Sequence, residues 1–172
     1  WIFGYKLHMV AGTGSIIVPL AADFTTANIP DNQIYSLLIT ASLPLAIIRM
    51  TSYMSADPGY DDHKLYYLST NMGFRLVCPV QRYKNTSDDR LKLVEFYESN
   101  IGQNIYSLRN TSIEPLIGRI KSALRIDPLP VRGYTKSCAI VLLSVLLYQI
   151  LVYYNCKTYR DNPMAIKYML GT

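Results

Sequence analysis

The sequence contains few of the residues that build disulfide frameworks or zinc sites. Its 172 residues include three cysteines, Cys78, Cys138 and Cys156, and two histidines, His8 and His63. The cysteines lie far apart and form no CxxC pair, which argues against both kinds of site and favours a reducing cytoplasm. Charged residues are also few, at 17%.

The N-terminus lacks the pattern of a signal peptide, because WIFGYKLHMV has no basic region followed by a long apolar core. It also lacks an initiating methionine. Since Trp1 falls inside a predicted strand, we expect the chain to be a fragment whose first strand is missing or incomplete.

Apolar residues make up half of the sequence, and tyrosine is frequent, at 15 residues. This composition predicts one globular domain with a large core. The net charge is +5, and six basic residues against two acidic ones lie in the segment 109–136. A polyanionic partner such as nucleic acid is therefore plausible.

Periodicity and turn residues predict an α/β order of elements. A hairpin is followed by alternating helices and strands and then by helices. The predicted ranges are strands 4–10 and 16–24, helix 32–41, a strand within 47–56, helix 62–72, strand 74–80, helix 88–98, an extended segment 101–107, a helix from 112 to about 124, and helix 139–154.

The helix that follows Ser112 combines a buried face with a line of ionisable residues. Ser112 is the expected cap, and Pro115 falls in the first turn, where proline is tolerated. At about 100° per residue, Glu114, Lys121 and Arg125 share one side of this helix. One interpretation is that Glu114 complements the helix dipole and the cations face solvent; the other is that Glu114 belongs to a site with further carboxylates.

Two other segments carry candidate site residues. Asp57 is expected at the carboxyl end of a strand, although Asp57-Pro58-Gly59 is also a strong turn sequence. Lys6 and His8 alternate with apolar residues in the first strand, so they either face solvent or serve the site.

Residues 139–154 form the one run that could be mistaken for a membrane span. The run is about 16 residues long, whereas a full span needs about 20. We expect a central buried helix, and a small membrane protein is the alternative.

Three sets of residues stand out along the chain: GYKLH from Gly4, ADPGYD from Ala56, and Tyr106, Arg109, Glu114 and Lys121 followed by IDPLPVRGY from Ile126. Together with the order of elements, they resemble the DDE transposases of prokaryotic insertion sequences, which have a ribonuclease-H-like mixed sheet flanked by helices. The resemblance extends from about Gly4 to Lys157.

The resemblance implies that Asp57 and Glu114 are the second and third catalytic carboxylates and bind Mg²⁺ or Mn²⁺, because such ions prefer oxygen ligands. It also implies contacts with DNA. The expected DNA-binding residues are Tyr106, Arg109, Lys121, Arg125, Lys6 and His8. The plain alternatives are a core or interface position for Tyr106 and solvated positions for Lys121, Arg132 and Lys136.

Two departures from the family pattern matter. Four residues separate Arg109 from Glu114, where the family has three. The first catalytic Asp belongs on a strand before GYKLH; Asp23 is on the wrong strand to replace it, and Asp31 is expected in a loop.

We therefore predict a partial catalytic core at residues 1–157 and a C-terminal tail at 158–172. The predicted protein is a metal-dependent transposase that cleaves and joins DNA. It is expected in the cytoplasm in association with the nucleoid, where it binds DNA and does not bind a membrane. The resemblance leaves a homo-oligomer open for the full-length protein. For this polypeptide the expected activity is that of a non-catalytic remnant with residual DNA binding.

Overall fold

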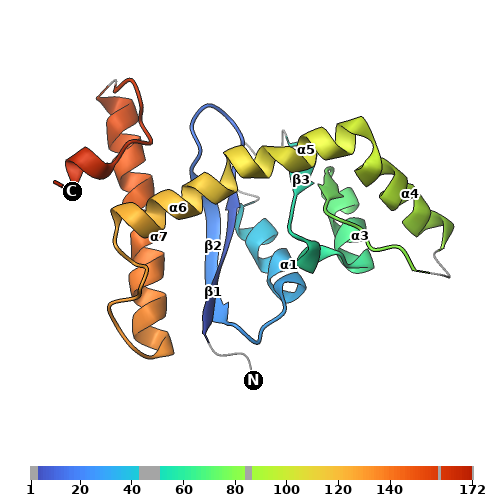
Figure 1. The fold of residues 1–172 in the computed structure, drawn as a ribbon, viewed down its shortest axis with the longest axis horizontal. Helices are drawn as coiled ribbons and strands as arrows, with labels where there is room; N and C mark the ends of the chain where they lie inside the picture. The colour runs from blue at the N-terminus through green and yellow to red at the C-terminus, as the bar shows by residue number, and fades with distance from the viewer. Residues whose placement is uncertain (1–3, 43–50, 84–86, 159, 172) are drawn as a thin grey trace. The chain divides into compact units, whose positions relative to one another are not determined.

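The computed structural model describes residues 4–42, 51–83, 87–158 and 160–171. Its chain divides into two compact units, residues 1–29 with 112–172 and residues 30–111. The elements are β1 (Tyr5–Ala11), β2 (Pro19–Thr26), α1 (Asp31–Ser42), β3 (Tyr53–Ser55), η1 (Pro58–Tyr60), α3 (His63–Asn71), β4 (Arg75–Val77), α4 (Asp88–Glu98), α5 (Asn100–Thr111), α6 (Ile113–Ala123), α7 (Tyr134–Lys157) and η2 (Lys167–Met169) (Figure 1).

In the first unit, β1 and β2 form the predicted antiparallel hairpin, with Leu7 opposite Phe24 and a register shift at Val10 and Ala11. Helix α7 lies along β2, and α6 contributes its apolar face to the same core. The C-terminal segment joins this core through Ile166, which is 2% exposed. The predicted boundary between a core at 1–157 and a tail at 158–172 stays a prediction.

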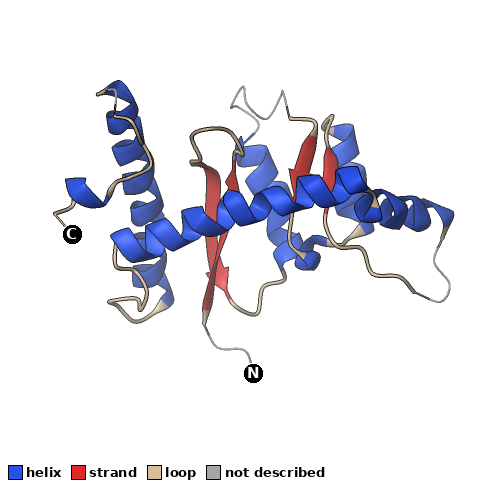
Figure 2. Cartoon of the chain, turned by 45° about the horizontal axis from the view of Figure 1, so that its top comes forward, coloured by secondary structure: helices blue, strands red, loops and turns tan. Residues whose placement is uncertain are grey.

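In the second unit, β3 and β4 pair in parallel, with Met54 opposite Leu76 (Figure 2). Helices α1 and α3 pack against each other, and α3 and α5 contact β4. The most buried apolar side chains of this unit are Ile39, Leu76, Val77 and Val94.

The predicted α/β class is confirmed, and the order of elements agrees with a ribonuclease-H-like fold. A mixed sheet contains antiparallel and parallel pairs of strands, and both kinds occur here. Among the described residues they form two separate two-stranded sheets, β1 with β2 and β3 with β4. The extended segment predicted at 101–107 is wrong, because these residues lie within helix α5. Ile101, Ile105 and Leu108 have the i, i+4, i+7 spacing of a helix. The part of the predicted strand at 47–50 lies outside the described residues.

The last long helix differs from its prediction in length and burial. α7 has 24 residues, and its most apolar window has a mean hydropathy of 2.0 with one third of it buried. Among the described residues it is therefore the one helix that could cross a membrane by length and composition. One face packs on the hairpin; the opposite face exposes large apolar side chains at Leu143, Leu146, Leu147, Ile150, Tyr153 and Tyr154. The prediction of a central buried helix is therefore correct for one face of α7 and wrong for the other.

Candidate functional site

Asp57 follows the carboxyl end of β3, as predicted. Ala56 N–H donates to Val77 O at 2.9 Å, so the parallel pairing continues one residue past Ser55. Asp57 then precedes the 3₁₀ turn η1, and Tyr60 N–H donates to its carbonyl at 3.0 Å. The two interpretations of this segment are thus both correct, because a turn presents the aspartate at the end of a strand.

The Asp57 carboxylate forms an ion pair with Arg109 of helix α5. The side chain of Asp57 is 57% exposed, whereas that of Arg109 is 13% exposed. Arg109 Nη1 also donates to Tyr106 Oη at 3.0 Å, and the Tyr106 ring meets Tyr97 edge to face at 5.5 Å. The structure therefore brings together three residues that the sequence assigned to the site from two distant segments.

Asp31 and Tyr60 also lie at this turn. Asp31 begins α1 instead of lying in the predicted loop, and its Oδ2 is 2.7 Å from where a Cβ on Gly59 would stand. Burial raises the pKa of Tyr60 to about 12, and the negative charges of Asp31 and Asp57 add to the effect. No local pattern in the sequence links Asp31 to Asp57, which is why sequence analysis did not place them together.

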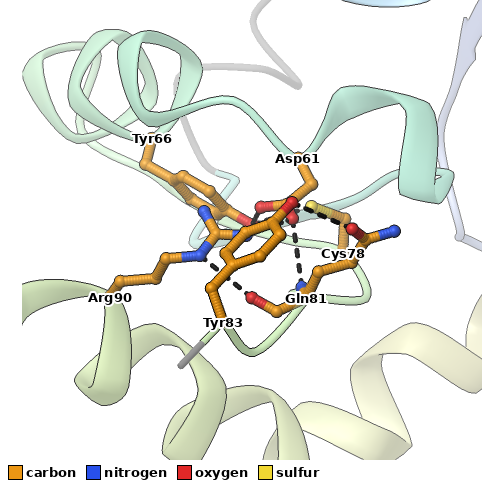
Figure 3. Close-up of polar contacts among 6 residues, drawn as sticks. All are labelled: Asp61, Tyr66, Cys78, Gln81, Tyr83 and Arg90. Atoms are coloured by element: carbon orange, nitrogen blue, oxygen red, sulfur yellow. Dashed lines mark hydrogen bonds and ion pairs between the residues drawn. The ribbon is translucent and has the colours of Figure 1, made fainter. Parts of the chain in front are cut away.

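Asp61, which directly follows this turn, forms a buried ion pair with Arg90 that the sequence analysis did not predict. Asp61 is 8% exposed and accepts from Arg90 Nη2 of α4 at 2.5 Å (Figure 3). Tyr66 Oη donates to its other oxygen at 3.1 Å, and Gln81 N–H donates to Oδ2 at 3.1 Å. Because a buried carboxylate needs such partners, this network fixes the chain directly after the turn.

Cys78 belongs to the same network, since its Sγ is 2.9 Å from Tyr66 Oη (Figure 3). Burial raises the pKa of the Cys78 thiol to about 11.

The thiolate is the reactive form, so we expect Cys78 to resist alkylation at pH 8, whereas the half-buried Cys138 and Cys156 react. Mass spectrometry after a timed iodoacetamide pulse measures this, with urea-unfolded chain as the control in which all three react. Equal labelling of Cys78 in the folded chain would contradict the buried network.

Glu114 lies in the first turn of α6 and is exposed. On the buried side of this helix, Leu116 and Ile120 are both 0% exposed, as the predicted stripe requires. Ser112 occupies the N-cap position, but its side chain makes no capping hydrogen bond.

The predicted line of ionisable residues on α6, from Glu114 through Lys121 to Arg125, is shorter in the structure. Lys121 Nζ pairs with Asp127 Oδ2 at 3.1 Å, and both side chains are more than half exposed; such pairs contribute about 0–1 kcal/mol. The helix ends at Ala123, and Arg125 has a φ of 51° in the left-handed region. Ile126 N–H bonds to Lys121 O at 3.2 Å, which is a Schellman-type C-cap. Arg125 therefore does not extend the line of Glu114 and Lys121, and that prediction is wrong.

Lys6 and His8 are less accessible than a solvated strand face would be. His8 is 5% exposed, and its Nε2 lies 2.8 Å from Thr25 Oγ1. Lys6 Nζ donates to Ile29 O at 3.2 Å. The alternative in which His8 faces solvent is wrong, while a role in DNA binding for both residues stays a prediction.

No group of three or more His, Cys, Asp and Glu that could hold a metal ion occurs within the described ranges of the chain. The donor chemistry of Asp57 and Glu114 does fit a hard divalent cation, because both offer carboxylate oxygens and are exposed. The two residues belong to different compact units, so a shared site stays a prediction.

Comparison with known proteins gives one result. No curated protein and no solved structure matches the chain at the significance that we require. The family model described as "Transposase DDE domain" matches residues 1–150, a range that includes both Asp57 and Glu114. The chain therefore belongs to the transposase DDE-domain family.

Proposed function

We propose that this chain carries the catalytic core of a DNA transposase of a prokaryotic insertion sequence, which cleaves DNA phosphodiesters and joins the ends to a target. The observation that carries the proposal is the family match across residues 1–150. The placement of Asp57 at the end of a parallel strand supports it, because side chains at strand carboxyl ends collect at one edge of a sheet.

Asp57 and Glu114 are the proposed catalytic carboxylates and metal ligands. Domains of this family generally depend on a divalent metal, and we assign Mg²⁺ or Mn²⁺. A pair of such ions, when bound, activates the attacking hydroxyl and stabilises the leaving oxygen. The protein would supply the hard oxygen ligands, which are the carboxylates of Asp57 and Glu114.

DNA is the proposed substrate and partner, and the family supports this assignment. Lys121 and Arg125 are the proposed contacts with phosphate, with Lys6 and His8 added from β1, and the resemblance assigns Tyr106 and Arg109 to the same role. Lys121 and Arg125 have exposed cationic side chains, which suits a sequence-independent electrostatic contact. The proposed location is the cytoplasm, at the nucleoid, with no membrane partner and with a homo-oligomer in the full-length enzyme.

The activity proposed for residues 1–172 alone is that of a remnant. By resemblance, they supply two of the three carboxylates of the family signature, Asp57 and Glu114. We expect this polypeptide to bind DNA and not to nick it when Mg²⁺ or Mn²⁺ is present. Robust metal-dependent nicking by this chain would overturn the remnant assignment.

The transposase assignment is tested in the product of the parent reading frame. Asp57→Asn and Glu114→Gln should each lower the rate of Mg²⁺-dependent strand cleavage by about a hundredfold or more, because each removes one ionised group that stabilises the reacting centre. Cleavage of a labelled duplex on a denaturing gel measures the rate.

Matched controls are Asp88→Asn and Glu95→Gln on α4, where both side chains are exposed. These variants should cleave like the parent protein. Cleavage at the parental rate by Asp57→Asn or Glu114→Gln would sink the assignment of that carboxylate.

A further inference from the structure

Arg109 is held from two sides. Through Nη2 it bonds Asp57 Oδ1, and through Nη1 it donates to Tyr106 Oη. Its guanidinium carbon also lies 5.2 Å from the centroid of the Tyr106 ring. The planar fork of a guanidinium fixes direction as well as charge, so two different partners define its orientation.

The exposed fractions of Arg109 and Asp57 indicate which of the two side chains holds the other in place. Arg109 is 13% exposed and Asp57 is 57% exposed, so the cation lies inside and the carboxylate faces outward. Turning Arg109 toward a DNA phosphate would break both of its bonds and move a largely buried group. Lys121, in contrast, is 53% exposed and pairs with Asp127, whose side chain is itself 60% exposed, so solvent screens this pair.

We infer that Arg109 is a positioning residue for Asp57, and that Tyr106 in turn orients Arg109, in place of the contacts with DNA that the resemblance assigns to this pair. The inference rests on the proposed function only in naming Asp57 as a catalytic carboxylate. The ion pair and the hydrogen bond define the positions of the groups without any ligand.

The first test is NMR of the chain of residues 1–172. Asp57→Asn should abolish the separate, slowly exchanging guanidinium signals of Arg109, because the neutral amide cannot form the ion pair that restrains the guanidinium group. Arg109→Gln should shift the ¹³C resonance of the Asp57 carboxyl, and Arg109→Lys, which keeps the charge, should shift it less. Lys121→Gln is the matched control and should leave both signals in place. An Asp57 resonance that does not move in either Arg109 variant would overturn the inference.

The second test separates positioning from DNA contact. Binding to a short duplex is measured by fluorescence anisotropy at several salt concentrations. Loss of one phosphate contact lowers the slope of log K against log salt by about 0.9. We expect Lys121→Gln to show this loss and Arg109→Lys and Arg109→Gln to keep the parental slope. A slope that falls in Arg109→Gln as it does in Lys121→Gln would overturn the inference.

Failure of the proposed function gives a different result. If the parent chain binds no duplex, the DNA assignment fails, and the NMR signals of Asp57 and Arg109 alone then decide whether the positioning pair exists.

Discussion

Asp61→Ala is expected to lower the free energy of unfolding by about 3–5 kcal/mol, because it leaves the largely buried Arg90 without its carboxylate. Asp61 and Arg90 are 8% and 17% exposed, so water cannot replace the lost partner. Tyr66 and the Gln81 N–H lose their acceptor in the same change. Urea unfolding followed by circular dichroism measures the difference.

The matched control is the pair of Arg82 and Glu98, whose side chains are 60% and 54% exposed. Glu98→Ala should change stability by less than about 1 kcal/mol, since solvent screens exposed pairs. If Asp61→Ala cost no more than Glu98→Ala, the buried network would not stabilise the unit of residues 30–111.

Tyr148→Ala is expected to destabilise the chain by about 3–5 kcal/mol, the usual cost of removing a fully buried aromatic ring. Tyr148 lies on the hairpin side of α7, is 0% exposed, and its hydroxyl donates to Ile17 O at 3.4 Å. Tyr148→Phe removes only that long hydrogen bond and should cost about 0.5–1.5 kcal/mol.

Tyr153→Ala on the same helix is the control, because Tyr153 is 64% exposed. Its ring faces Lys157 Nζ at 5.5 Å, a contact that contributes about 0.5–1 kcal/mol at exposed sites. Thermal unfolding of the three variants orders these effects. Equal losses for Tyr148→Ala and Tyr153→Ala would contradict the packing of α7 on β2.

Local patterns predicted most elements of this fold. The apolar stripe of α6 and the turn between the two strands of the hairpin each depend on a few neighbouring residues, so both can be predicted from the sequence. The failures also have local causes. The segment 101–107 carries polar residues and Gly102 among its apolar positions, which hid its helical period. Arg125 is not on the line of Glu114 and Lys121 because α6 ends at Ala123, two residues before it.

The sequence predicted which residues belong to the candidate site, but it did not predict the contacts between them. Asp57 and Arg109 came from two motifs, but their ion pair depends on how α5 packs beside β3. Asp31 carried no motif at all. Its place beside Gly59 follows from tertiary packing, which a periodic pattern does not encode.

The hydrogen bonds between β2 and α7 affect the order of events on the ribosome. Gln149 Nε2 donates to Pro19 O at 2.8 Å across 130 residues of chain, and Tyr148 reaches back to Ile17 across 131. Domains fold as their chain emerges, from the N-terminus onward. The hairpin must therefore wait, without its covering helix, until α7 has been made, whereas residues 30–111 can fold before that.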